Sequence, residues 1–171
     1  PTLFERIWRG SMPGIVSGLY RDRNMYYSSY ISTYVERDVR DISGTVDALK
    51  FNRFITAVAA RTSQLLNYKA IAEDTDIDMA TAKAWIAILE TLGIIFLLHP
   101  YSNNVLKRTI KTPKVYFYDT GLVCYLTKWS SPEVAESGAM SGALLENFTI
   151  SEIMKGYQNA GLEPYLYFYR D

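Results

Sequence analysis

Four basic residues lie close together in a stretch without any acidic residue between positions 101 and 118, namely Lys107, Arg108, Lys111 and Lys114. Such side chains can neutralise about three or four phosphates, which would give salt-sensitive nucleic-acid contact that is independent of base sequence. On extended strands, Lys107 and Lys111 would share one face and Arg108 the other, so the four charges would not meet a single phosphate run. The alternative is a solvated hairpin whose charges only discourage edge pairing.

Two other residues have chemistry suited to phosphate or metal. Arg37 could act as an arginine finger across a subunit boundary, because a guanidinium suits the charge of a transferring phosphate. Asp38 beside it and Asp41 at helical spacing favour an internal ion pair instead. Glu146 could be one carboxylate of a metal site, but only if a missing module completes the site, because one carboxylate alone binds Mg²⁺ poorly. We therefore predict no catalytic residue and no complete metal site in this chain.

The basic stretch follows a pattern that is typical of a helix-turn-helix. Residues 69–73 are predicted to form a short helix, and either Asp76 or Asp78 in the polar break at 74–78 can cap a second helix. Gly93 is expected to end this second helix. Its packing stripe has three- and four-residue spacing and consists of Met79, Ala82, Ile86, Leu89 and Gly93.

A wing is predicted after the second helix. The apolar run 94–98 stops before Pro100, and the chain returns as strand candidates at 105–110 and 114–118. A longer amphipathic helix at 46–66 would precede this unit and pack beneath it. The order of helix, helix and hairpin is that of a winged helix, and the predicted fold class is α+β with mainly helical content.

The second helix is poorly suited to ordinary reading of the major groove. Its first turn is preceded by four carboxylates: Glu73, Asp74, Asp76 and Asp78. These charges would repel the DNA backbone. Trp85 and Ile88 make the second face of the helix apolar, and a helix that is apolar nearly all round is buried on both sides. We therefore predict that Trp85 and Ile88 pack against a partner, another segment or a second copy, with Arg37 as a further candidate for partner contact.

Composition sets only broad limits on function. Lys plus Arg and Asp plus Glu each total 18, so no net charge draws the chain to nucleic acid or to acidic lipid. The single cysteine, Cys124, excludes an internal disulfide and a cysteine-rich zinc site. No apolar run approaches ~18 residues and no leader peptide opens the chain, so we expect no membrane association and a cytoplasmic location. Pro1 in first place and an aromatic run at 165–171 indicate a fragment.

Seven stretches of the chain together resemble one known family. They are LFERIWRGSMP (3–13), YISTYVERDVR (30–40), PYSNN (100–104), KR (107–108), KTPK (111–114), YFYDTGL (116–122) and GALLE (142–146). The family is the domain of unknown function that lies carboxy-terminal to the ATPase module in predicted prokaryotic AAA-type ATPases. The resemblance covers nearly the whole chain in the same order.

The resemblance implies modules that this chain lacks. An upstream ATPase module would bind ATP and Mg²⁺, whereas no Gly-x-x-x-x-Gly-Lys-Ser/Thr motif occurs here and no Gly is followed by Lys. We therefore expect no cofactor and no ATP hydrolysis in this chain. The family also commonly continues past Arg170 into a restriction-endonuclease-like fold, for which Glu146 would be the helix glutamate.

The predicted organisation has three regions. Residues 1–44 would be a helical connector to the ATPase module, 45–128 the winged helix, and 129–171 the start of a truncated α/β endonuclease-like module. A mobile connection at 130–140 is the expected boundary, and Asp119 is the expected cap of the helix before it. The predicted function is a non-catalytic adaptor whose candidate partners are the ATPase module, another protein or a second copy, and DNA. The alternatives are a fragment of a metal-dependent nuclease and a wing-led DNA-binding regulator.

Overall fold

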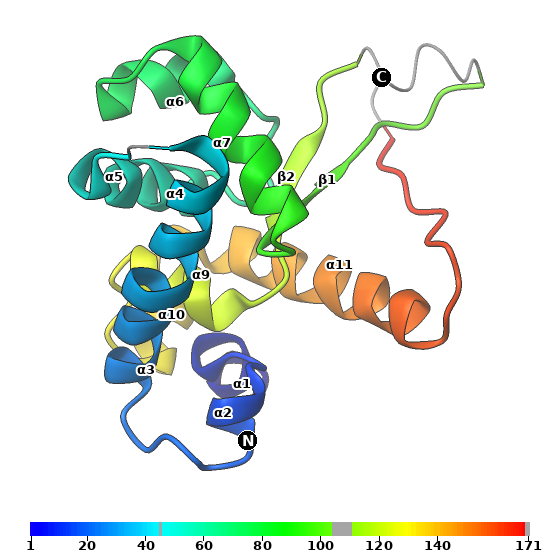
Figure 1. The fold of residues 1–171 in the computed structure, drawn as a ribbon. Coiled ribbons are helices and arrows are strands. Elements are labelled where there is room, and N and C mark those ends of the chain that lie inside the picture. Colours follow the sequence, from blue (N-terminus) through cyan, green and yellow to red (C-terminus); the bar gives the residue numbers. More distant parts are fainter. Residues whose placement is uncertain (45, 104–110, 170–171) are drawn as a thin grey trace.

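The structure, a computed structural model, describes residues 1–44, 46–103 and 111–169. The described part is mainly helical with one two-stranded antiparallel sheet, which confirms the α+β class (Figure 1). The elements are, in chain order, α1 (Leu3–Arg9), α2 (Pro13–Val16), α3 (Arg23–Ser29), the π-helix η1 (Tyr30–Val35), α4 (Glu36–Ser43), α5 (Ala48–Ala59), α6 (Tyr68–Thr75), α7 (Met79–Thr91), β1 (Ile95–Leu98), β2 (Lys114–Phe117), α9 (Thr120–Leu126), α10 (Pro132–Ser137) and α11 (Ser141–Asn159).

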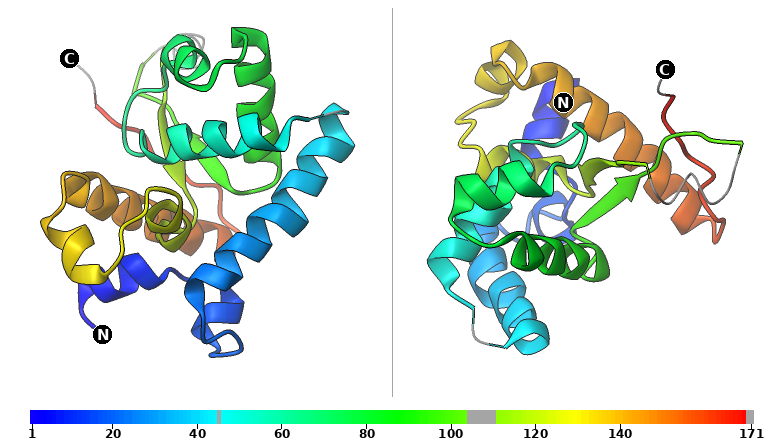
Figure 2. Two further views of the ribbon diagram at one scale, coloured as in Figure 1. Left: turned by 90° about the vertical axis from the view of Figure 1, so that its left-hand side faces the viewer. Right: turned by 90° about the horizontal axis from the view of Figure 1, so that it is seen from above.

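Helices α3, η1 and α4 follow one another without a break and form one long rod along the side of the molecule (Figure 2). Its inner face repeats every four residues and consists of the buried side chains Tyr27, Ile31, Val35 and Val39. The helical connector predicted at 1–44 is thus helical here, and Ile42 near the end of the rod is 55% exposed. Gly44 ends the rod with a φ of 79°, a backbone conformation that glycine adopts at little cost.

Helices α5, α6 and α7 each begin at a polar residue that accepts hydrogen bonds from the first turn. Asp47, Asn67 and Asp78 are these caps, so the predicted cap of α7 is Asp78. Asp76 instead lies in the left-handed region, with φ 54°, and makes the turn between α6 and α7. The two predicted helices are therefore present and are joined by a tight polar turn.

The predicted helix at 46–66 is wrong at its carboxy-terminal end, because α5 stops at Ala59. The chain turns through Ser63, whose φ is 66°, and then lies beside β2. The Ser63 N–H donates to the carbonyl of Val115 at 2.8 Å, and the Leu66 N–H donates to the carbonyl of Pro113 at 2.8 Å. Pairing with a strand about fifty residues later in the sequence thus overrides the local helical pattern.

Strands β1 and β2 are antiparallel, with Ile95 opposite Phe117 and Leu98 opposite Lys114. They confirm the strands predicted at 94–98 and 114–118, whereas the strand predicted at 105–110 lies outside the described residues. Of the aromatic run at 165–171, Phe168 forms a single parallel bridge with Pro100.

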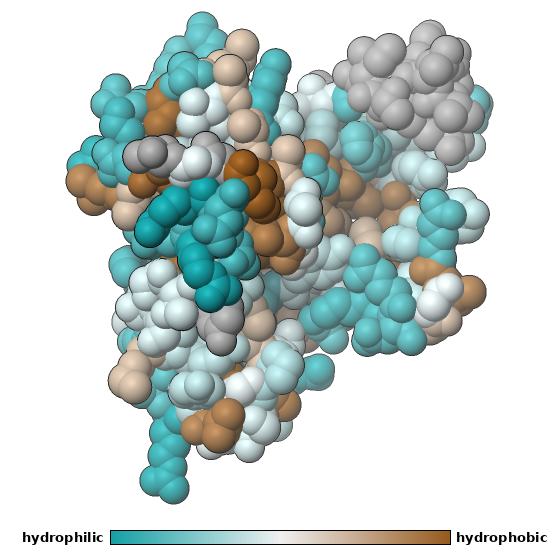
Figure 3. All heavy atoms as spheres, in the orientation of Figure 1, coloured by the Kyte–Doolittle hydropathy of each residue, from teal (hydrophilic) through white to brown (hydrophobic). Residues whose placement is uncertain are grey.

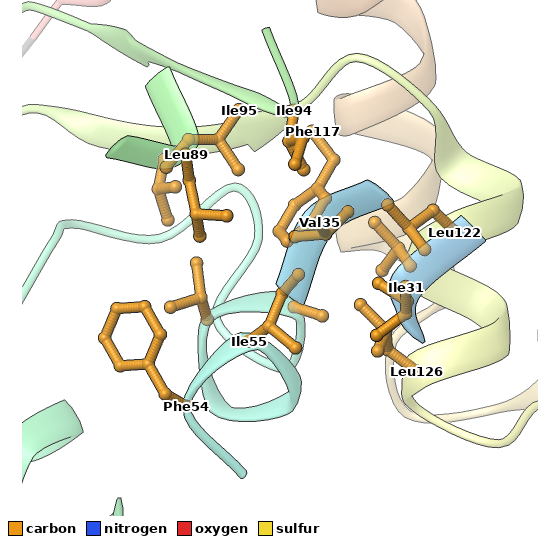
Figure 4. Packing of buried hydrophobic residues seen from close by; sticks show 14 of the residues in the cluster. Ile31, Val35, Phe54, Ile55, Leu89, Ile94, Ile95, Phe117, Leu122 and Leu126 are labelled. Atoms are coloured by element: carbon orange, nitrogen blue, oxygen red, sulfur yellow. The ribbon is translucent and has the colours of Figure 1, made fainter. Parts of the chain in front are cut away.

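One hydrophobic core extends through all three predicted regions. Close packing joins Ile31 and Val35 of the rod, Ile55 of α5, and Phe117 and Leu122 near the sheet (Figure 4). Leu144 of α11 belongs to the same cluster. The predicted boundaries near residues 44 and 128 are therefore not breaks in packing.

The stretch at 130–140, predicted to be a mobile connection, contains helix α10. Ser131 caps this helix, Ala135 is fully buried, and the helix packs on α1. Together with α11, which packs on β2, it attaches the carboxy-terminal region to the rest of the chain.

Candidate functional site

Glu146, one of the predicted candidates, meets two side chains of β2. Lys114 and Tyr116 are two residues apart on this strand, so their side chains point to the same face, toward α11. The Lys114 ammonium lies 2.8 Å from Glu146 Oε1, and the Tyr116 hydroxyl donates to the same oxygen at 2.6 Å. The structure thus brings together a candidate for nucleic-acid contact and the carboxylate that was a candidate for a metal site only if a missing module completed it.

The environment makes Tyr116 a hydrogen-bond donor rather than an acid. Its side chain is fully buried and its ring stacks on Phe96, with centroids 5.5 Å apart. Burial raises the pKa of Tyr116 far above the usual value, and the hydrogen bond to Glu146 and its negative charge raise this pKa further. Lys114 and Glu146 are 25% and 41% exposed, so solvent partly screens their attraction. The three residues therefore form a clamp between β2 and α11.

The next residue on α11, Asn147, completes this clamp from inside the core. Its Oδ1 accepts the N–H of Phe117 at 2.8 Å, and its Nδ2 donates to the carbonyl of Phe117 at 2.8 Å. The hydroxyl of Thr62 also donates to Asn147 Oδ1. A fully buried side-chain amide thus pairs with the strand as a neighbouring strand would. Sequence reasoning missed Asn147, whose only signal is a polar residue on the apolar face of a predicted helix.

Asp119 is the cap of α9, as predicted, and it has a wider role. Its Oδ1 accepts the Leu122 N–H at 2.7 Å and the Tyr27 hydroxyl at 2.6 Å, while its Oδ2 accepts the Ser11 N–H at 2.6 Å. Burial and the charge of Asp119 raise the pKa of Tyr27 well above its usual range. One buried carboxylate therefore joins the amino-terminal segment, the rod and α9.

The backbone of the amino-terminal segment lies so close to Gly121 that no side chain fits at this position. A Cβ at this position would lie 2.6 Å from Cα of Gly10 and 2.7 Å from the carbonyl oxygen of Arg9. Because backbone atoms cannot move aside as side chains can, only glycine fits between α9 and the end of α1.

The predicted nucleic-acid residues are only partly described. Lys107 and Arg108 lie outside the described residues, Lys111 is exposed, and Lys114 is bound to Glu146. The four predicted charges are therefore not equivalent, because Lys114 already has a carboxylate partner.

The predicted partner-binding residues on α7 are in the core. Trp85 and Ile88 are only 6% and 7% exposed. The indole of Trp85 makes edge contacts with Phe51 and Phe54 of α5, with ring centroids 5.4 and 5.2 Å apart. Of the three possibilities left open for this face, the structure therefore shows packing against another segment. The prediction that Trp85 and Ile88 bind a partner is wrong, because both side chains are buried inside the chain.

Arg37 lies on the exposed surface of α4 and forms an ion pair with Asp38, with a distance of 3.3 Å between Nη2 and Oδ1. This is the internal ion pair predicted as the alternative to an arginine finger. Both side chains remain accessible, at 59% and 36% exposed.

The residues around Glu146 do not fit a divalent cation as they stand. Oε1 of Glu146 already accepts from Lys114 and Tyr116, and a cation needs several oxygen ligands. Within the described ranges, no three His, Cys, Asp or Glu side chains are grouped so that they could hold a metal ion.

Among the residues that the structure describes, no helix has both the length and the apolar character required to cross a membrane.

Comparison with known proteins places the chain among relatives that are much longer. It is 27% identical over 151 residues to the uncharacterized proteins Mb2031c of Mycobacterium bovis and Rv2008c of Mycobacterium tuberculosis. The match covers 87% of this chain but only 34% of each relative, so the chain spans about a third of their length. No solved structure matches the chain. Residues 1–133 match a domain of unknown function, DUF8612, and the chain therefore belongs to this family.

Proposed function

We propose that this chain is a non-catalytic accessory region of an AAA-type ATPase, and that it couples the nucleotide state of the ATPase module to a partner by protein contact. The resemblance of seven stretches to the region that follows such modules supports this role. The length of the mycobacterial relatives also supports it, because the matched part is only 34% of each and leaves room for further modules.

In this proposal, α5, α6, α7, β1 and β2 form a winged helix that serves mainly as a scaffold. The order of the elements is three helices followed by an antiparallel pair of strands. Trp85 and Ile88 hold α7 in the core, and the clamp between β2 and α11 attaches the pair of strands to the rest of the chain. In this proposal the winged helix therefore moves together with α11, to which β2 is attached.

An exposed apolar patch carries the proposed docking role. Val16, Leu19 and Met25 lie on α2, α3 and the connection between them, and they are 54%, 75% and 62% exposed. We name these three residues the α2–α3 patch. In Figure 3, the lower part of the molecule, where Figure 1 places these elements, shows separate hydrophobic groups among polar atoms. Large apolar side chains that are exposed within one short segment are candidates for a contact surface.

The proposed occupant of the α2–α3 patch is the ATPase module. The resemblance places that module upstream of this chain, and the patch lies on the part of the chain nearest to it in sequence. Interfaces between modules of one chain are of moderate size and expose apolar side chains when the modules separate.

The test uses the longer protein that contains the ATPase module. Leu19→Glu combined with Met25→Glu should separate the modules, because burying two carboxylates without partners is costly. The expected results are faster amide hydrogen exchange in residues 13–29 and a changed rate of ATP hydrolysis. Leu49→Glu is the matched control, because Leu49 is also 62% exposed but lies on α5 outside the patch. Unchanged exchange in the double variant would overturn the docking role.

Sequence-independent contact with duplex DNA is a second candidate function, and the state of Lys111 favours it. Lys111 is exposed and has no ion-pair partner among the residues that the structure describes. Its charge is therefore available to a phosphate, whereas the charge of Lys114 is shared with Glu146.

A further inference from the structure

An open hollow lies beside the carboxy-terminal end of α1 and the start of α3. Its volume is about 620 Å³, which is within the range of about 300–1,000 Å³ for small-molecule sites. The residues of its lining that bear on recognition are Trp8, Arg9, Tyr20, Arg21, Asp22 and Arg23. Three arginines and one aspartate thus share one wall, although the chain as a whole has no net charge.

Arg23 is the deepest of the three arginines and is only 9% exposed. Its Nε donates to the carbonyl of Trp8 at 2.8 Å, one Nη donates to the carbonyl of Gly121 at 2.8 Å, and the other donates to the Asn24 side chain at 3.1 Å. The guanidinium carbon lies 4.2 Å from the centre of the Trp8 ring. These contacts hold the group in one orientation and use three of its five N–H donors.

All hydrogen-bond partners of Arg23 in the described part of the chain are neutral oxygens. No carboxylate of the described residues lies within 4.0 Å of Arg23, Arg9 or Arg21. Asp119 acts on Arg23 at longer range, but both its oxygens already accept other hydrogen bonds. A buried guanidinium whose nearest negative charge is not in direct contact keeps part of its desolvation cost, so an anionic ligand would be stabilised here.

The single acidic residue of the lining does not neutralise this charge. Asp22 is the cap of α3, and its Oδ1 accepts the Met25 N–H at 3.0 Å. Arg9 and Arg21 are both exposed at the rim, so they can turn toward a ligand without leaving a buried partner unpaired. Guanidinium groups bind phosphate oxygens in a forked geometry, which makes a group of arginines a phosphate-binding surface.

We propose that this hollow binds a small phosphorylated molecule, with Arg23 as the fixed anchor of the phosphate and Arg9 and Arg21 as the mobile arms. Tyr20, which is 45% exposed on the same wall, provides a ring against which the rest of the ligand packs. The site requires neither the ATPase module nor the α2–α3 patch, so it is independent of the proposed docking role.

The first test measures binding of inorganic pyrophosphate and of ADP to the whole 171-residue chain by isothermal titration calorimetry. Both should bind, and Arg9→Glu combined with Arg21→Glu should weaken binding about tenfold or more, since both positions lose a charged hydrogen bond to phosphate. These two variants are preferred because both side chains are exposed and the fold does not depend on them. Arg23→Lys is the further variant, which retains the charge but loses the fork.

The control is Arg40→Glu combined with Arg53→Glu, which makes the same total change of charge at exposed positions on α4 and α5 outside the hollow. Binding should be unchanged in this variant. An equal loss in the control would overturn the site, because it would show attraction by overall charge alone. Failure of both probes to bind at millimolar concentration would also overturn it, as would adenosine binding as tightly as ADP. None of these outcomes depends on whether the α2–α3 patch docks a partner.

Discussion

The Lys114 ammonium lies 2.8 Å from Glu146 Oε1, although Lys114 was a candidate for nucleic-acid contact and Glu146 only a conditional candidate for a metal site. Because Tyr116 donates to the same oxygen, the carboxylate stabilises both a cation and a buried hydroxyl. The arrangement reduces the charge that Lys114 can offer to phosphate and the oxygens that Glu146 can offer to metal. It favours a structural role for both residues, in which α11 is held against β2.

Glu146→Gln should lower the free energy of unfolding by about 1 kcal/mol, because a charged hydrogen bond and a partly exposed ion pair are both weakened. Urea denaturation at neutral pH measures this. Glu152→Gln is a matched control, since Glu152 is also 41% exposed and pairs with Lys155, which is 27% exposed. Without a buried hydroxyl partner, the control should change stability by less than about 0.5 kcal/mol. Equal losses would contradict the role assigned to Tyr116.

Asn147→Ala should destabilise the chain by about 2–4 kcal/mol, because the N–H and carbonyl of Phe117 would both lose a buried partner. The same urea experiment measures the loss. Thr149→Ala is the control on the same helix, because Thr149 is exposed and its hydroxyl donates to the carbonyl of Leu145 within that helix. If Asn147→Ala were as stable as this control, the amide would not be replacing a strand partner.

Cys124 should be unreactive in the native chain. Burial raises the pKa of the Cys124 thiol to about 12, whereas an unfolded cysteine has a pKa of about 8.5. The folded state thus favours the neutral thiol, and this contribution to stability is complete below about pH 8.5 and is lost as pH rises toward the folded-state value. Alkylation by iodoacetamide near pH 9, followed by mass spectrometry, should be slow in buffer and fast in urea. Similar rates would show that the thiol is accessible.

Lys111→Ala should weaken low-salt binding to duplex DNA more than Lys114→Ala does. Loss of one phosphate contact should reduce the slope of log binding constant against log salt by about 0.9, and Lys114 shares its charge with Glu146. Fluorescence anisotropy at several salt concentrations measures both slopes. A larger effect of Lys114→Ala, or no binding by the parent chain at low salt, would remove DNA contact as a candidate function.

Sequence patterns predicted the local features best. Asp119 was expected as a cap, Asp78 was one of two candidate caps of α7, and Gly93 was expected to end α7; the structure has all three features. These features depend on residues within one turn of each other, so they can be read without knowledge of the fold. The end of α5 could not be predicted in this way, because residues 63–66 leave the helical pattern to pair with β2.

The sequence pattern also did not show which residues the apolar faces of the helices pack against. Trp85 and Ile88 were expected to be buried on a second face of α7, which is confirmed, but their neighbours were not specified. The hydrophobic effect depends on the apolar area removed from water and has no direction. The sequence pattern therefore could not show whether Trp85 packs against Phe51 and Phe54, as it does, or against a second chain.

The sequence by itself determined the existence of α5, α6 and α7, the caps of α7 and α9, the two described strands and the absence of net charge. The tertiary structure decided which charges meet. Lys114 and Glu146 are 32 residues apart, and Tyr27 and Asp119 are 92 apart. Arg23, which lines the hollow beside α1, is 98 residues from Gly121, whose carbonyl accepts one of its hydrogen bonds. Such pairs form only when packing brings distant elements within hydrogen-bond distance, because a hydrogen bond acts over about 3 Å and leaves no periodic trace in the sequence.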